Sequence, residues 1–292
     1  MRQISPSPLP QKRSESMNFN SDVVVHKNIN GTEFIQFRKL LEYPNLVHCY
    51  TLRKNGINIQ VKNGDNTELI NSYKKIIESL NTSLDITLNT TFDINNIVKP
   101  HQTHTDRVEI VEDTQQNFEE VDGVITNKKD ILLCTTSADC TSLLFYDNNK
   151  KVVGDVHSGW RGTLKKIGKK AVEKMIQEYD CNPKDIICCI GPCIKKCHFE
   201  VEEDVMKLFK NEFETTGKIQ EIIGKGRVIN GVQKYNIDTT LINKIILLEA
   251  GLLLENVIDS GICTVCNSAS FHSYRADKEK SGRNGAFIGM MA

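Results

Sequence analysis

The sequence lacks an excess of charge of either sign, since Lys plus Arg and Asp plus Glu number 37 each. Proteins dedicated to nucleic acids usually carry a basic patch or stripe, so we expect no nucleic-acid partner. No stretch approaches the roughly 18 apolar residues of a membrane span. The first 30 residues also lack an apolar core of signal-peptide length. We therefore expect a cytoplasmic protein that does not contact a membrane.

The numbers of cysteines and histidines limit the disulfide and metal chemistry that this protein can support. Ten cysteines among 292 residues are too few for a disulfide scaffold. Reduced cysteines of a cytosolic protein are more often buried apolar residues or metal ligands than members of a disulfide. A laccase needs several coppers and many histidines, whereas this chain has seven histidines and no His-x-His pair. Multicopper oxidation is therefore poorly supported.

The chain reads as one domain behind a short leader. Residues 1–16 hold three of the seven prolines, and we expect residues 1–17 to be a disordered leader and residues 18–292 a single catalytic domain. Strands and helices mix irregularly, which favours a mixed β-sheet layered with helices in an α/β fold. The pattern predicts strands at 47–53, 121–127, 131–136 and 185–192, and helices at 66–80, at 201–213, from Thr163 onward, and at 239–250 behind Asp238 as N-cap.

The stretch 137–162 organises the candidate site. It reads as two short strands around a turn at 147–150, which pairs Tyr146 with Lys151 and sets Cys140 opposite His157. Opposed residues have Cβ atoms roughly 4.5–5.5 Å apart, close enough for a thiolate and an imidazole to share one metal ion. The hairpin therefore predicts two ligands of a metal site.

The hairpin does not identify the third protein ligand of this metal site. A catalytic zinc takes three protein ligands and leaves one position open. His101 and His104 are both candidates, and their spacing does not choose between them. Copper must also be considered, because two histidines and one cysteine form the trigonal blue-copper ligand set.

A rival metal site lies further along the chain. His198 and Glu200 match the H-x-E of zinc nucleoside deaminases, with Cys263 and Cys266 as the C-x-x-C. Cys197 with Cys263 and Cys266 is another possible second site. Core packing is the better interpretation of Cys188 and Cys189, which lie in an apolar run.

Several motifs follow one another in the order found in a known family. They are Gln102-Thr103-His104, Asp122-Gly123-Val124, Ser137-Ala138-Asp139-Cys140, Val156-His157-Ser158-Gly159-Trp160-Arg161-Gly162, Ile190-Gly191-Pro192 and Ser273-Tyr274-Arg275. Together they closely resemble the laccase-domain family, once described as multicopper polyphenol oxidases, which includes bacterial YfiH and YlmD and mammalian FAMIN. The resemblance covers about residues 45–292.

This resemblance implies a YfiH-like single domain with zinc bound by His104, Cys140 and His157. It also implies a purine nucleoside enzyme that phosphorolyses adenosine, inosine, guanosine and methylthioadenosine to base and ribose 1-phosphate, and that deaminates adenosine. Its partners would be a purine nucleoside and phosphate. The protein itself would be a monomer or a small homo-oligomer.

Three arginines are candidates to hold the phosphate dianion: Arg53, Arg161 and Arg275. Arg161 lies four residues after His157, where a helix is expected to begin.

Two alternative functions stay open. One is a copper-dependent polyphenol oxidase, and the other is a non-catalytic factor in peptidoglycan precursor quality control.

Overall fold

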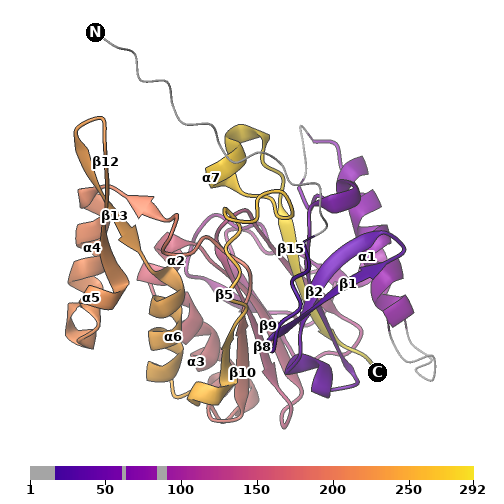
Figure 1. Cartoon of the computed structure of the whole chain (residues 1–292). Helices are drawn as coiled ribbons and strands as arrows, with labels where there is room; N and C mark the ends of the chain where they lie inside the picture. The colour runs from indigo at the N-terminus through magenta and orange to yellow at the C-terminus, as the bar shows by residue number, and fades with distance from the viewer. Residues whose placement is uncertain (1–16, 61–63, 84–90) are drawn as a thin grey trace.

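Two six-stranded sheets lie face to face at the centre of the computed structural model, which describes residues 17–60, 64–83 and 91–292 (Figure 1). The order of the first sheet is β1 (Val24–Ile29), β2 (Thr32–Phe37), β3 (Leu46–Thr51), β15 (Asn284–Met290), β7 (Leu132–Ser137) and β4 (Ile97–Val98). The order of the second is β14 (Val257–Asp259), β10 (Ile186–Ile190), β8 (Thr141–Asp147), β9 (Val152–Ser158), β6 (Gly123–Thr126) and β5 (Val108–Ile110). The predicted α/β class is confirmed.

The main core fills the space between the two sheets. Tyr50 and Ile288 of the first sheet pack in one cluster with Leu144 and Val153 of the second, all nearly free of solvent contact. Each such side chain stabilises the fold by roughly 1.5–3 kcal/mol through burial. The sheets are therefore rigid supports for the loops at their ends.

Helices cover the two outer faces. Helix α1 (Thr67–Ser83) packs on the first sheet through apolar residues at helical spacing, among them Tyr73 and Ile76. Helices α3 (Ile167–Tyr179) and α6 (Thr239–Glu249) lie on the second sheet, and both contribute to its outer cluster. The helix predicted at 66–80 is confirmed by α1. Within the described residues, no helix combines the length and apolar character needed to cross a membrane.

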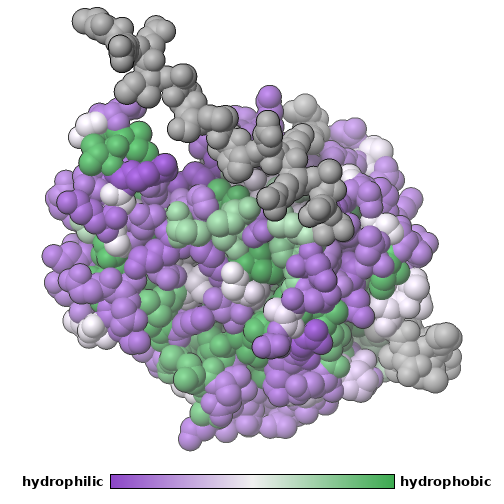
Figure 2. All heavy atoms as spheres, viewed as in Figure 1, coloured by the Kyte–Doolittle hydropathy of each residue, from purple (hydrophilic) through white to green (hydrophobic). Residues whose placement is uncertain are grey.

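A smaller lobe joins α6 at one side of the molecule (Figure 1). It contains α4 (Glu203–Phe213), α5 (Ile219–Ile222), and a three-stranded sheet of β11 (Glu200–Val201), β13 (Val232–Ile237) and β12 (Ile223–Ile229). Its core forms around Phe209 and Phe213. The β12–β13 hairpin was not predicted, although Asn230-Gly231 at its turn is a strong hairpin signal. Apolar side chains gather at its tip, where Val228 and Val232 are exposed (Figure 2).

The remaining helix predictions were partly right. Helices α4 and α6 match the expected ranges, and the Asp238 side chain caps α6 by accepting a hydrogen bond from Leu241 N at 2.9 Å. The helix expected from Thr163 is wrong at its start. The chain forms a short α2 (Trp160–Leu164) and then breaks at Lys166, whose φ of 57° is left-handed. Thr163 lies inside α2, where its hydroxyl bonds to that of Ser158 instead of capping a helix.

The register predicted for the 137–162 hairpin was wrong by two residues. Tyr146 pairs with Val153 and not with Lys151, and Ser142 is the residue opposite His157. The turn therefore occupies residues 148–151, with Lys151 in the left-handed region. Because side chains alternate with a period of two, a shift of two residues keeps Cys140 and His157 on the same face. They are therefore diagonal neighbours across the two strands and are not directly opposed.

The expected leader, residues 1–17, lies outside the described residues except for Met17. Most of that expectation therefore stays a prediction.

A last short helix, α7 (Tyr274–Asp277), precedes β15 and begins where Ser273 Oγ accepts a hydrogen bond from Ala276 N.

The buried His48 gives the fold a dependence on pH. Its Nε2 accepts a hydrogen bond from Phe37 N at 2.7 Å, and burial lowers the pKa of His48 to about 3. The unfolded chain, with a histidine pKa of about 6.5, therefore binds more protons between pH 6.5 and 3, so folding stability falls as pH falls through that window. At pH 5 the loss is roughly 2 kcal/mol.

We expect His48→Gln to shrink the difference in unfolding free energy between pH 7 and pH 5 by about that amount. Urea unfolding of metal-free protein at the two pH values measures it. His101→Gln, at an exposed position, controls for loss of a histidine. An unchanged difference in His48→Gln would contradict the assignment.

Candidate metal centre and adjoining pocket

Three of the predicted site residues meet at one end of the β8–β9 hairpin. His104 Nε2 lies 3.8 Å from Cys140 Sγ, and the rings of His104 and His157 stand nearly perpendicular with centroids 4.9 Å apart. One ligand atom from each of the three residues lies within 4.8 Å of the others. His101 is not part of this group, because its Nδ1 pairs with Glu119 Oε2 at 2.6 Å on the surface.

Asp122 connects the two histidines, a role that its place in the Asp-Gly-Val motif did not predict. Its Oδ1 accepts a hydrogen bond from His157 Nδ1 at 2.8 Å, which leaves Nε2 free as a ligand atom. The same carboxylate accepts hydrogen bonds from the backbone N–H groups of Thr103, His104 and Thr105, at 3.3, 3.1 and 2.6 Å. One buried side chain therefore orients His157 and folds the loop that carries His104.

The electrostatics of the group depend on this carboxylate. Burial by itself would raise the pKa of Asp122, but the hydrogen bond from His157 and those from Thr105 lower it to about 2. Burial opposes charge on His157, yet the neighbouring Cys140 and Asp122 raise its pKa to about 9. Burial likewise opposes ionisation of Cys140, and the two histidines lower its pKa to about 6. The cysteine is therefore prepared as a thiolate, which is the form that binds metals.

The loop of residues 101–105 is tightly held. The Gln102 amide pairs with both backbone groups of Thr136, donating to the oxygen at 2.9 Å and accepting from N–H at 2.8 Å. His104 itself has a φ of 62°, an uncommon backbone state for a residue with a side chain. A Cβ at Gly159 would lie 2.7 Å from the His104 ring, so only glycine leaves room for it there.

The donor set fits a metal ion. Imidazole and thiolate ligands suit zinc or copper, and a ligating histidine commonly donates its second N–H to a carboxylate, as His157 does to Asp122. His104, Cys140 and His157 would supply three ligands to one ion. A four-coordinate ion held by these three residues would have one position open.

A pocket with an empty volume of about 540 Å³, counting its mouth, opens beside Cys140. Its walls combine aromatic and apolar side chains with a few polar ones. Trp160 comes from α2, Phe199 from the segment before β11, and Tyr274 from α7. Walls that combine aromatic side chains with polar groups such as those of Thr141 and Ser158 are typical of sites for small aromatic ligands.

The three arginines differ in what they contact. Arg53 donates to Asp277 Oδ2 at 2.5 Å and to Ser268 O at 2.9 Å, and it does not line the pocket. Arg275 lines the pocket, but its guanidinium donates to the backbone oxygens of His198 and Glu200, at 2.7 and 3.2 Å. Arg161 stacks on Trp160 at 4.2 Å beside the pocket, although, like Arg53, it is not among the side chains that line it, and within the described residues it forms no ion pair.

Asp139 is held away from the ligand group. Its carboxylate accepts hydrogen bonds from Thr264 Oγ1 and from Arg275 N, each at 2.6 Å. Its backbone φ is 92°, which turns the chain sharply just before Cys140. Asp139 therefore joins three segments around the pocket and shapes the backbone that presents the cysteine.

In the deaminase-like arrangement, His198, Cys263 and Cys266 do lie together, but the role of proton shuttle given to Glu200 is wrong. Its carboxylate forms a bidentate pair with Arg227, at 2.9 and 2.7 Å, and is not among the side chains that gather near His198. Cys188 and Cys189 are buried in β10, which confirms that they belong to the core.

Comparison with known proteins agrees with the motifs. The family described as multi-copper polyphenol oxidoreductase laccase matches residues 48–291. The chain belongs to this family. It is 32% identical over 240 residues to the purine nucleoside phosphorylase YlmD of Bacillus subtilis, covering 74% of this chain and 84% of that protein. It is 28% identical over 213 residues to the adenosine deaminase RL5 of an unknown prokaryotic organism, covering 70% of this chain and 79% of that protein.

Solved structures of family members share the fold. YlmD from Geobacillus stearothermophilus superposes with a TM-score of 0.77 at 24% identity, covering 92% of this chain and all of that one. The Bacillus licheniformis protein YfiH gives a TM-score of 0.74 at 24% identity, with coverage of 88% and 96%. The expected YfiH-like single-domain fold is confirmed.

Asp122→Asn should weaken metal binding. Asparagine offers a single acceptor oxygen where Asp122 serves His157 and three backbone N–H groups. Loss of such a partner typically costs about 10–100-fold in metal affinity. Competition with a chromogenic chelator measures that affinity, and Asp113→Asn is a matched control at an exposed position. Unchanged affinity in Asp122→Asn would contradict the role given to this carboxylate.

Proposed function

We propose that this protein is a zinc-dependent purine nucleoside phosphorylase that also deaminates adenosine. The observation that carries the proposal is the group of His104, Cys140 and His157 beside a pocket with aromatic walls. The names of two relatives, a purine nucleoside phosphorylase and an adenosine deaminase, support the substrate class. Adenosine, inosine, guanosine and methylthioadenosine are the proposed substrates.

His104, Cys140 and His157 are the proposed zinc ligands. Zinc bound there would supply Lewis-acid polarisation of an atom of the substrate or of water. Asp122 keeps the His157 proton on Nδ1 and holds the His104 loop in its left-handed turn. The Cys140 thiolate brings a negative charge to the edge of the pocket.

The pocket residues would place the nucleoside. Trp160 and Phe199 offer faces on which a purine can stack, and aromatic walls exclude water from the reacting bond. In phosphorolysis, a phosphate oxygen bonds to ribose C1′ as the bond from C1′ to the base breaks, and the base takes up a proton. In deamination, water replaces the amino group of adenosine, which leaves as ammonia.

Arg161 is the proposed phosphate ligand among the three arginines. Its guanidinium is exposed and held by stacking on Trp160, whereas the groups of Arg53 and Arg275 already donate to other partners. A guanidinium without an ion pair can form two parallel hydrogen bonds to a phosphate.

Incubation of zinc-loaded protein with adenosine tests the reaction. With phosphate we expect adenine and ribose 1-phosphate together with inosine, and without phosphate we expect inosine and no ribose 1-phosphate. Cys140→Ala should abolish both reactions and lose the zinc of this site, while Cys181→Ala, a core cysteine, should keep both.

No product from metal-replete wild type under either condition would exclude the nucleoside function. Oxidation of a phenol at a rate proportional to bound copper would instead establish the polyphenol oxidase alternative, the activity that the family's description names.

Arg161→Gln should raise the KM for phosphate roughly tenfold or more, since a hydrogen bond to a charged group is worth about 1.5–3 kcal/mol. Deamination of adenosine, which uses no phosphate, should keep its rate. The matched control is Lys165→Gln, which removes an exposed cation that pairs with Asp106. An equal loss of both activities in Arg161→Gln would show a general role in the pocket and not a phosphate contact.

A further inference from the structure

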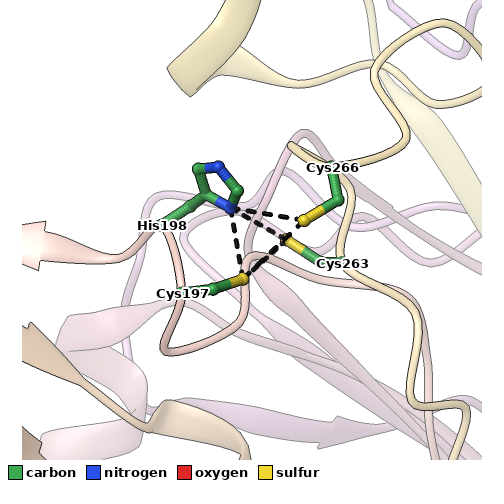
Figure 3. A group of neighbouring side chains, drawn as sticks. All are labelled: Cys197, His198, Cys263 and Cys266. Carbon is green, nitrogen blue, oxygen red and sulfur yellow. Dashed lines mark hydrogen bonds between the residues drawn. The ribbon is translucent and has the colours of Figure 1, made fainter.

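A second group of metal-binding side chains lies outside the site described above. Cys197 and His198 come from the segment between β10 and β11, and Cys263 and Cys266 follow β14. Although the two pairs are separated by more than sixty residues of sequence, the four side chains point toward a common centre (Figure 3).

Most of the distances within this group are close to the edges of a tetrahedron around a zinc ion. The Sγ atom of Cys197 lies 3.7 Å from that of Cys263 and 3.8 Å from that of Cys266. His198 Nδ1 lies 3.2, 3.7 and 3.5 Å from the sulfurs of Cys197, Cys263 and Cys266. Tetrahedral zinc with bonds of about 2.3 Å to sulfur and about 2.0–2.1 Å to nitrogen requires edges of about 3.8 Å and about 3.6 Å.

Neither a disulfide nor ordinary core packing accounts for the group. A disulfide joins two sulfurs at about 2.05 Å and gives no reason for a third cysteine and a histidine around the same point. Core packing does not account for it either, because Cys197 and Cys266 are exposed while Cys188 and Cys189 are fully buried. Three thiolates and an imidazole around one centre are a ligand set typical of zinc.

We propose that Cys197, His198, Cys263 and Cys266 bind a structural zinc ion, separate from the site at His104, Cys140 and His157. With four protein ligands the coordination is closed, so this ion would have no open position for substrate or water. Zinc binding here does not depend on the proposed enzymatic activity.

The proposed ion links two segments that build the pocket. The neighbouring backbones are already paired, since Cys193 N donates to Ile262 O and Thr264 N donates to Cys193 O, at 3.2 and 3.1 Å. Thr264, between the two ligand cysteines, holds Asp139 beside Cys140. Phe199, directly after His198, lines the pocket. The ion would therefore fix one wall of the pocket from its outer side.

Zinc content per chain tests the proposal. After zinc loading and removal of loose metal, we expect two zinc ions in the full-length wild type, one in Cys140→Ala, one in Cys266→Ser, and none in the double variant. The matched control Cys181→Ala should keep two. One zinc in wild type that Cys140→Ala removes entirely, or two zincs in Cys266→Ser, would overturn the proposal.

Alkylation gives a readout that does not require substitution at this group. In zinc-loaded Cys140→Ala, the exposed Cys197 and Cys266 should resist N-ethylmaleimide until a strong chelator is added, as peptide mass spectrometry would show. Rapid modification before the chelator would overturn the proposal. So would two cysteines that stay blocked after the chelator and become reactive with a reductant, because they would form a disulfide.

Discussion

The Asp122 carboxylate is the contact on which the metal centre depends. It lies directly before β6, buried between strand β9, which carries His157, and the loop that carries His104. Five hydrogen bonds converge on its two oxygens, from His157, from three successive backbone N–H groups and from the Thr105 hydroxyl. A charge buried at this depth is tolerated because each of its acceptor sites has a donor. The same bonds set the tautomer of one histidine and the backbone of the other.

Asp139 connects the segments that carry the two groups of metal-binding residues. Its backbone presents Cys140, and its carboxylate holds Thr264 and the N–H of Arg275. Arg275 in turn binds the backbone on either side of Phe199. Part of the pocket is thus built from loops, among them the segments that carry Asp139 and Phe199. Polar contacts to buried side chains, and in our proposal a second zinc ion, give these loops the rigidity that sheets and helices provide elsewhere.

Local patterns predicted the local structure well. The helical repeat at 66–80 and the Asp238 cap correspond to α1 and α6, and the apolar run at 185–192 to β10. The hairpin at 137–162 was found with a register two residues off, because the turn begins after Asp147, which still pairs in the strand. An even shift preserves the face of every side chain, so the inference about Cys140 and His157 survived the error. The β12–β13 hairpin was missed despite its Asn-Gly turn.

By itself, the sequence determined the chemistry that is available. It supplied a cysteine and a histidine on one face of a hairpin, two candidate histidines in a loop, and motifs in the order of one family. The family resemblance implied His104 in place of His101, and the tertiary structure shows that His104 meets them. Only the tertiary structure decided that Asp122 orients the group and that Arg53 and Arg275 already have partners. It also decided that Cys197 and His198 meet Cys263 and Cys266. The physical reason is that periodicity and capping report on neighbours within a few residues, whereas these contacts join segments whose approach is set by the packing of two whole sheets.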